Sequence, residues 1–214
     1  MTNGLHAAEI RPPSLRDRQR AERELLILAE AERLLREEGY EGLVMERLAD
    51  GVGVSKGTLY QHFAKKEDLV GAILLRSTAR VNEQLAVLTA DGARPAVERL
   101  SAVLTLLIEG DVAWMATVTH PQKHELAAAL GNLPGLRDGF TRFFDGLCSL
   151  ILQGQASGEL DAAVPAPIAA RFLLSVARAQ GGPALGGQIS VSGQEFVALA
   201  VRFYFHGLRA QPAT

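Results

Sequence analysis

Residues 48–63 read LADGVGVSKGTLYQHF, and two short segments that could be helical meet there across Gly53. A helix-turn-helix is built this way: two short helices cross at a steep angle through a tight turn that often contains glycine. Ser55 directly follows the turn, where its hydroxyl can accept a hydrogen bond from a free backbone N–H and cap the second helix. Leu59 and Phe63, four residues apart, share the inner face of that helix. The stretch therefore predicts a helix-turn-helix.

The outer face of the second helix is polar. Its side chains are hydrogen-bond donors with little reason to be buried together, namely Lys56, Thr58, Tyr60, Gln61 and His62. Gly57 has no Cβ, so it would let the helix approach a DNA duplex closely. Lys65 and Lys66 open the next helix, where a lysine opposes the helix dipole. A nearby phosphate would explain that placement, and a merely solvated charged pair is the alternative.

Together with Lys66-Glu67-Asp68-Leu69, this stretch resembles the DNA-binding domain of TetR-family regulators. The resemblance covers about residues 18–73. The rest of the chain is similar only in layout, as a divergent helical ligand domain whose last two helices pair with a second subunit. The resemblance implies a homodimer that represses transcription until a ligand spreads its two DNA-reading heads. The DNA-binding residues expected on this basis are Lys56, Gly57, Thr58, Tyr60, Gln61, His62 and Lys66.

These residues are expected to differ in role. Tyr60 and His62 match family positions that contact the DNA backbone, and such contacts position a protein without reading sequence. Thr58 and Gln61 are the residues that we expect at base edges. Lys66 matches a lysine that binds phosphate in the family.

Two places depart from the family pattern. Leu43 and Val44 stand where many relatives have a Ser or Thr that caps the first helix of the motif and touches phosphate. Lys65 stands where a small capping residue is common. Arginines earlier in the chain could supply the missing phosphate contacts, although arginine-rich helix starts are often only solvated surface. They are Arg11, Arg16, Arg18, Arg20 and Arg23.

Helical periodicity extends over nearly the whole chain, and no segment reads convincingly as a strand. The expected fold is all-α with about nine helices, at 16–38, 45–50, 55–63, 67–89, 95–108, 114–130, 136–156, 167–180 and 194–210. We expect three parts along the chain. They are a flexible N-terminal lead over 1–15, the helix-turn-helix domain over 16–66, and a ligand-binding and dimerisation domain over 67–214.

Aromatic residues in the middle of the chain could line a ligand cavity or simply fill a core, since cavities for small ligands have mostly apolar walls. The candidate ligand-binding residues are Trp114, Met115, His120, Phe140, Phe143 and Phe144. His120 and His124 could also bind a metal, but Pro121 lies between them and no Cys or third His is near in sequence. We therefore expect no metal site and no cofactor.

The last two predicted helices carry more apolar residues than one buried stripe requires. Small residues among them would allow helices to approach closely, so an isologous four-helix interface between two copies is the natural interpretation. A monomeric core is the alternative. The candidate dimer residues are Phe172, Val176, Phe196, Ala200 and Phe203. Two-fold symmetry would place two recognition helices about 34–36 Å apart, which suits successive faces of the major groove.

The composition fits a packed protein, with 48% hydrophobic and 21% charged residues among 214. A net charge of −2 is mild evidence against DNA binding, which the local arginines offset. No stretch approaches the roughly 20 apolar residues that span a bilayer, so no membrane partner is expected. The single cysteine, Cys148, reads as a small core residue and fits a reducing cytoplasm.

The sequence therefore predicts a ligand-responsive transcriptional regulator, a repressor that binds a palindromic operator as a homodimer and is released by an apolar small molecule. The long helix over 67–89 would be its hinge. An enzyme is the first rival, but no catalytic residue is expected, because neither a Gly-x-Ser-x-Gly motif nor a phosphate loop occurs. The second rival is an interaction module that binds another protein through 45–62. Such a module would show no salt-dependent DNA affinity.

Overall fold

The computed structural model of the protein describes residues 14–109, 130, 133–179 and 193–208. These residues form eight α-helices, so the predicted all-α fold is confirmed. The helices are α1 Leu15–Gly42, α2 Met45–Val52, α3 Lys56–His62, α4 Lys66–Ala90, α5 Ala96–Glu109, α8 Leu136–Ala156, α9 Ala166–Ala179 and α10 Gly193–Leu208. The helix expected over 114–130 lies outside the described residues except for Leu130.

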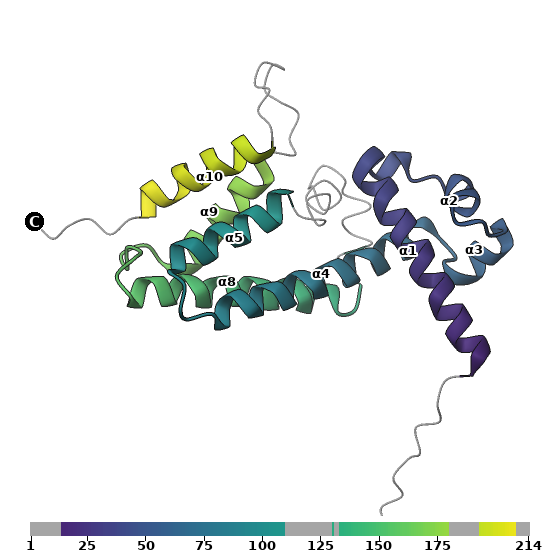
Figure 1. Cartoon of the computed structure of the whole chain (residues 1–214), viewed down its shortest axis with the longest axis horizontal. Helices are drawn as coiled ribbons and strands as arrows, with labels where there is room; N and C mark the ends of the chain where they lie inside the picture. The colour runs from purple at the N-terminus through teal and green to yellow at the C-terminus, as the bar shows by residue number, and fades with distance from the viewer. Residues whose placement is uncertain (1–13, 110–129, 131–132, 180–192, 209–214) are drawn as a thin grey trace, which may run out of the picture.

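The helices form two groups joined by α4 (Figure 1). At one end α1, α2 and α3 pack around the start of α4, and at the other end α5 and α8 lie against α4 while α9 and α10 pack on α5 and α8. The first group has its own buried cluster, in which Ile27, Leu48 and Leu59 are fully buried. Apolar residues at helical spacing on each helix converge there because burial removes them from water.

α4 and α8 lie side by side and run in the same direction (Figure 1). Gly139 and Gly146 of α8, seven residues apart, face Thr78 and Leu85 of α4. A Cβ on Gly139 would stand 2.6 Å from Thr78 Cγ2, closer than real Cβ atoms approach. Asn82 strengthens the same contact, since its side-chain amide donates to the carbonyl oxygen of Gly139 at 3.0 Å. Glycine therefore sets the distance between the two helices.

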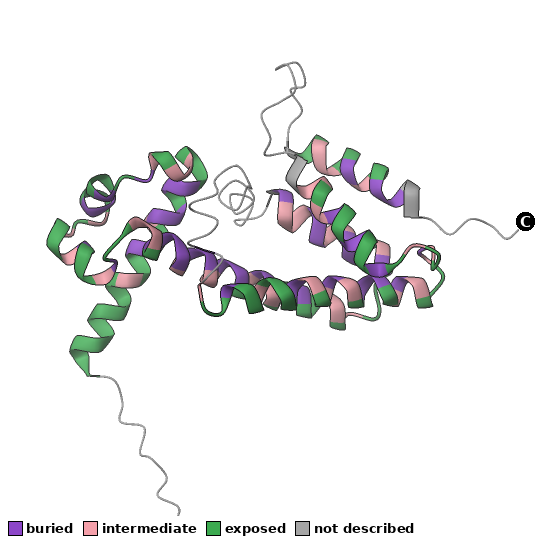
Figure 2. Cartoon of the chain, turned by 180° about the vertical axis from the view of Figure 1, so that it is seen from behind, coloured by how far each residue is buried: buried purple, intermediate pink, exposed green. Residues whose placement is uncertain are grey.

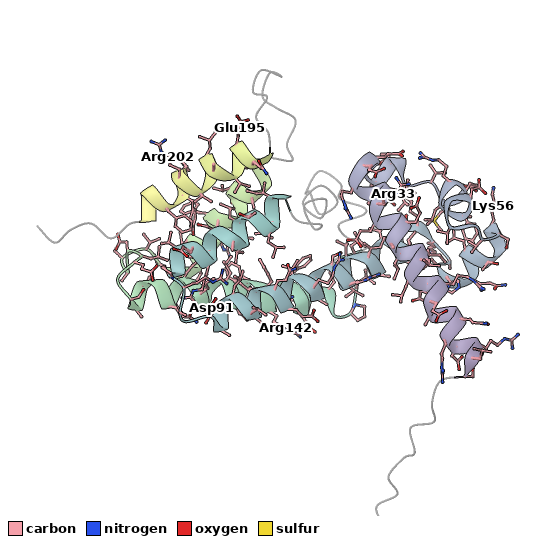
Figure 3. The ribbon with its side chains drawn as sticks, viewed as in Figure 1. Arg33, Lys56, Asp91, Arg142, Glu195 and Arg202 are labelled. Carbon is pink, nitrogen blue, oxygen red and sulfur yellow. The ribbon has the colours of Figure 1, made fainter. Side chains whose placement is uncertain are left out.

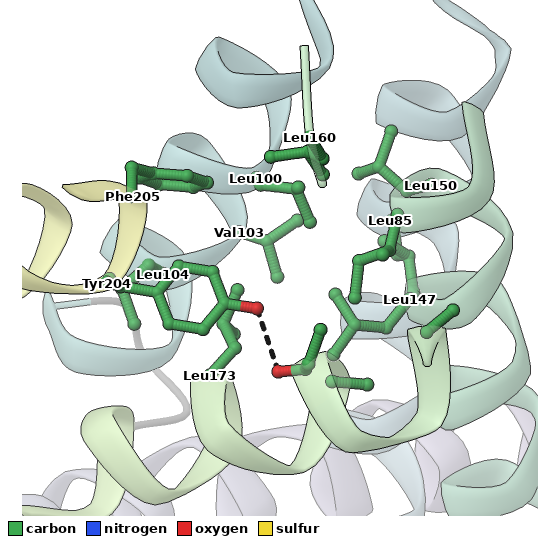
Figure 4. Close-up of a cluster of buried hydrophobic side chains, with 14 of the residues drawn as sticks. Leu85, Leu100, Val103, Leu104, Leu147, Leu150, Leu160, Leu173, Tyr204 and Phe205 are labelled. Atoms are coloured by element: carbon green, nitrogen blue, oxygen red, sulfur yellow. Dashed lines mark hydrogen bonds between the residues drawn. The ribbon is translucent and has the colours of Figure 1, made fainter. Parts of the chain in front are cut away.

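The second group has a core of its own, in which leucines from α5 and α8 meet aromatic residues from α10 (Figure 4). Tyr204 is buried, and its hydroxyl donates to the carbonyl oxygen of Ala169 at 2.8 Å. Burial raises the pKa of this phenol, so it stays neutral and acts as a donor. Arg99 is buried too, and it donates to the Gln153 side chain at 2.7 Å and to carbonyl oxygens at the end of α4.

One ion pair ties the first group directly to α4. Glu32 of α1 is only 5% exposed, and its carboxylate accepts a hydrogen bond from the guanidinium of Arg80. Arg80 also lies 3.3 Å from the hydroxyl of Ser77 on its own helix. A buried carboxylate needs such a partner because an unpaired charge is costly away from water. The pair therefore fixes where α1 lies along α4.

The close approach of α8 to α4 can be tested by enlarging Gly139. Gly139→Val should lower the free energy of unfolding by about 1–3 kcal/mol, because overpacking forces the neighbouring helix to shift. Gly92→Val adds the same side chain where no atom lies within 4 Å, and should change stability by less than about 0.5 kcal/mol. Denaturant unfolding of both variants makes the comparison. Equal stability of the two would show that the glycine contact does not set the helix spacing.

Candidate nucleic-acid interface

The turn between α2 and α3 has the geometry that the sequence predicts. Gly53 ends α2 in the left-handed region, with φ 73° and ψ 35°, where a residue with a Cβ is strained. Its N–H donates to the carbonyl oxygen of Asp50 at 3.1 Å, and the N–H of Val54 donates to that of Ala49 at 2.9 Å. Because Ala49 is fully buried, this turn brings α3 against the core of the domain.

Ser55 caps α3, as predicted. Its Oγ accepts a hydrogen bond from the backbone N–H of Thr58 at 3.1 Å. The hydroxyls of Ser55 and Thr58 also lie 2.9 Å apart and share a hydrogen bond. The Thr58 hydroxyl is thus engaged in the cap, and a contact with a base would have to share or replace that bond.

The outward face of α3 is open. Lys56, Gly57 and Gln61 are exposed, and Tyr60 keeps 44% of its surface exposed although it is a large aromatic residue. Lys56 stands at the outer edge of the domain (Figure 3) and its Nζ lies 3.2 Å from Oε1 of Glu46 on α2. A hydrogen bond from the backbone N–H of Glu46 itself and then Lys56 lower the pKa of that carboxyl. Exposed ion pairs of this kind are weak, so a phosphate could replace Glu46 as the partner.

His62 ends α3 in a different environment from Tyr60. Its side chain is only 4% exposed, and its Nδ1 lies 3.5 Å from Oε2 of Glu24 on α1. Nδ1 is buried and has no hydrogen-bond partner among the described residues. The sequence pattern groups His62 with the polar outer face, whereas the structure packs it where α3 meets α1. Its contact with DNA stays a prediction.

Lys66 is held in place by a residue to which no sequence motif points. Its Nζ lies 4.0 Å from the centre of the Tyr40 ring, a cation–π distance. The Tyr40 hydroxyl in turn donates to Oε1 of Glu67 at 3.1 Å. Burial, and then the Glu67 carboxylate, raise the pKa of Tyr40 to about 12. The only hint of this role for Tyr40 in the sequence is that an aromatic residue directly follows Gly39. In the structure Gly39 has a φ of 72° and kinks the end of α1.

The two departures from the family pattern are visible at the helix starts. Val44 precedes α2 and makes no side-chain cap. At the start of α4, the backbone N–H of Lys65 donates instead to the Asp68 carboxylate at 3.1 Å. The first turn of α4 is therefore stabilised by an acid three residues into the helix, which also suits the positive end of the helix dipole.

The candidate ligand residues are only partly visible. Trp114, Met115 and His120 lie outside the described residues. On α8, Phe143 is 8% exposed and belongs to the core, Phe144 is half-buried against it, and Phe140 is 40% exposed. A separate hollow of about 450 Å³ lies beside the DNA-binding domain and is lined by Lys65, Glu67, Asp68, Leu130 and Leu133. It contains none of the candidates.

The candidate dimer residues lie on α9 and α10, and two of the five are exposed. Phe172 is 60% and Phe203 is 78% exposed, while Val176 and Phe196 are half-buried. Ala200 is 6% exposed and packs inside the chain's own core. Ile168 and Leu199, each four residues before one of the phenylalanines, are exposed as well. Ile168, Phe172, Leu199 and Phe203 together form an uncovered apolar face on α9 and α10.

Metal ligands do not gather in the described part of the chain. Within it, no three His, Cys, Asp or Glu side chains come together as the ligands of an ion would. None of the helices described there combines the length and the apolar character needed to cross a bilayer.

Comparison of the amino-acid sequence with known proteins finds matches mainly in the N-terminal part of the chain, which contains the helix-turn-helix. Residues 27–73 match the family model of bacterial regulatory proteins of the TetR family. The HTH-type transcriptional repressor AcnR of Corynebacterium diphtheriae is 42% identical over 60 residues, which is 28% of this chain and 32% of AcnR. An HTH-type transcriptional regulator of Mycobacterium tuberculosis is 36% identical over 120 residues, or 53% of this chain and 59% of that protein. The chain thus spans less than two thirds of either relative.

Solved structures match over most of the chain. AibR, in complex with isovaleryl coenzyme A and operator DNA, has a TM-score of 0.64 at 22% identity, over 86% of this chain and 98% of AibR. FadR from Bacillus subtilis, in complex with stearoyl-CoA, has a TM-score of 0.65 at 18% identity, over 86% of this chain and 98% of FadR. At identities this low, the structural similarity establishes a shared fold alone.

The Ser55 cap can be tested for its contribution to stability. Ser55→Ala should lower the free energy of unfolding by about 1 kcal/mol, because the N–H of Thr58 loses its acceptor. Ser55→Asn, which keeps a capping oxygen, should stay close to the wild type. Denaturant unfolding measures both. If the alanine variant is as stable as the asparagine variant, the cap does not hold α3.

Proposed function

The chain belongs to the TetR family of bacterial regulatory proteins, and from that premise we propose that it is a ligand-responsive repressor of transcription rather than an enzyme. It binds a palindromic operator in the cytoplasm as a homodimer, and an apolar small molecule releases it. The observation that carries this proposal is the polar outer face of the capped helix α3, which is open around Tyr60 and Gln61. The relation to AcnR, a repressor, supports the direction of control.

On DNA, α3 occupies the major groove. Gln61, exposed near the end of α3, reads a base edge, and Tyr60 binds the backbone. Gly57 has open space in front of it, since only the Ser55 side chain lies within 4 Å of where a Cβ would be. Lys66, supported by the Tyr40 ring, binds a phosphate at the edge of the groove. Phosphate contacts set the register of the helix and base contacts the sequence.

Ligand control works through differential binding. The ligand stabilises a conformer in which the two α3 helices no longer match the spacing of the half-sites, so affinity for the operator falls. α4 transmits the change because it enters both cores and carries Arg80, which holds Glu32 of α1. The solved relatives bound to isovaleryl coenzyme A and stearoyl-CoA make acyl-CoA esters the first probes to try.

DNA binding is tested by selecting duplexes from a random library and titrating the enriched one by fluorescence anisotropy at two salt concentrations. We expect a palindromic site whose affinity falls as salt rises, because phosphate contacts release counterions. Tyr60→Ala should weaken binding by about tenfold or more, as the loss of a hydrogen bond to a charged group does. Gln61→Ala should relax preference at one base position per half-site.

Gln84→Ala is the matched control, since Gln84 is an exposed glutamine on α4 away from the helix-turn-helix. It should bind as the wild type does. Failure to enrich any duplex, or affinity without salt dependence, would favour the interaction module instead. Unchanged binding by Tyr60→Ala would remove that residue from the interface.

The dimer uses the uncovered apolar face of α9 and α10. Burial of an aromatic residue as exposed as Phe203 against a second copy removes its apolar surface from water, which stabilises the dimer. Phe203→Asp places a charge in that interface and should convert the dimer to a monomer in light scattering. Val87→Asp is the control, since Val87 is 68% exposed on α4, outside this face, and its variant should stay dimeric. A dimer that survives Phe203→Asp would refute the α9–α10 interface.

A further inference from the structure

The first turns of α1 project beyond the DNA-binding domain without entering its core. Every residue from 15 to 23 is exposed, as Figure 2 shows for the start of this helix. A capping box nevertheless begins the helix there. The N–H of Asp17 donates to Ser14 Oγ at 3.2 Å, and the N–H of Ser14 donates to the Asp17 carboxylate at 3.1 Å. These turns are therefore a preformed helix that packs against no other element of the described chain.

One face of this projecting segment is basic. Arg16, Arg20 and Arg23 are spaced i, i+4 and i+7, so they lie in one row along the helix, and we call this row the basic stripe. The same row continues to Ile27, which is fully buried in the domain core. The basic stripe thus extends, beyond the domain, the side of α1 that packs against α2 and α4.

Three acidic residues, Asp17, Glu22 and Glu24, also lie on these turns of α1, and Asp17 is hydrogen-bonded within the helix cap. The Asp17 carboxylate accepts hydrogen bonds from the backbone and the hydroxyl of Ser14, which together lower the pKa of Asp17. The Glu24 carboxylate points to His62 at 3.5 Å. None of the three occupies the row of arginines. The stripe can therefore offer guanidinium groups to an external anion.

The contact between His62 and Glu24 fixes the position of the stripe. It places the last residue of α3 beside α1, one residue after the stripe ends at Arg23. From Glu24 back to Arg16 the helix axis advances about 12 Å, at 1.5 Å per residue. The major groove is also about 12 Å wide. With α3 in the groove, a helix of this length that starts beside the end of α3 is long enough to reach the sugar-phosphate backbone at the edge of the groove.

We propose that the basic stripe of α1 binds backbone phosphates of the DNA that flanks the base pairs read by α3, and so lengthens the operator that the protein needs. This inference rests on the proposed DNA-binding function. Guanidinium groups match phosphate geometry, often through two parallel hydrogen bonds. Phosphate contacts carry no base information, so the stripe adds affinity and salt dependence without changing sequence preference. It also supplies contacts that Val44, which has no hydroxyl, cannot make.

The test combines a charge change with a change in DNA length. The stripe variant carries Arg16→Gln, Arg20→Gln and Arg23→Gln, since glutamine has nearly the helix propensity of arginine. The control variant carries Arg137→Gln, Arg142→Gln and Arg171→Gln, three exposed arginines on α8 and α9. Each full-length protein is titrated, over a series of salt concentrations, against the selected operator with long flanks and against the same operator trimmed to the base pairs that selection enriches.

The wild type and the control variant should lose affinity when the flanks are trimmed. The stripe variant should bind the long duplex more weakly, and trimming should change its affinity little. Its plot of log affinity against log salt should be shallower by about 0.9 for each phosphate that the stripe no longer neutralises, doubled in a homodimer. Repeating the library selection with the stripe variant should return the same sequence.

Other outcomes separate this inference from the function on which it rests. If the wild type enriches no duplex, the proposed DNA-binding function fails and the stripe with it. If the wild type binds its operator but the stripe variant has the same salt slope and the same response to trimming, only the role of the stripe is refuted. A changed sequence preference would also refute it, because the arginines would then read bases. Circular dichroism of the variant checks that α1 remains helical.

Discussion

The burial of one helix in two cores is the constraint on which the rest of this molecule depends. Leu69 and Ile73, in the first half of α4, belong to the core of the DNA-binding domain, whereas Val81 and Leu85, in its second half, belong to the other core. A continuous helix cannot turn one half without turning the other, since its backbone hydrogen bonds run through both. Gly139 and Gly146 of α8 bring that helix tightly against α4, where they face Thr78 and Leu85. The two domains are therefore mechanically linked.

This link determines how a signal could travel. α4 begins at the DNA-binding end with Lys65 and Lys66, and it carries Arg80, which pairs with the buried carboxylate of Glu32 on α1. A tilt of α4 would therefore move the whole DNA-binding domain as a unit, because α1 is fastened to α4 both by the core and by this ion pair. Rigid-body movement of packed helices is one of the known ways in which small shifts at an effector site become large ones.

The side of the molecule that we propose faces DNA is built from interactions in which a phosphate could replace the present partner. Lys56 pairs with Glu46 and Lys66 lies over the ring of Tyr40, and both are partly open to solvent. Contacts of this strength orient a side chain before binding without holding it firmly. The helix itself is held more rigidly, by the Ser55 cap and by the burial of Leu59. A fixed helix with adjustable cations suits the recognition of a charged, regular polymer.

Much of this architecture can be predicted from the amino-acid sequence by itself, because local rules decide it. The turn at Gly53 and the Ser55 cap follow from neighbouring residues and are confirmed, as are the helical periods within the described part of the chain. Other features depend on residues far apart in the chain, and no local pattern contains them. They include the ion pair of Glu32 with Arg80, the Tyr40 ring beneath Lys66, and the packing of His62 against α1. The helical repeat of polar and apolar residues identifies which face of a helix is polar, whereas only the tertiary structure decides which residues that face contacts.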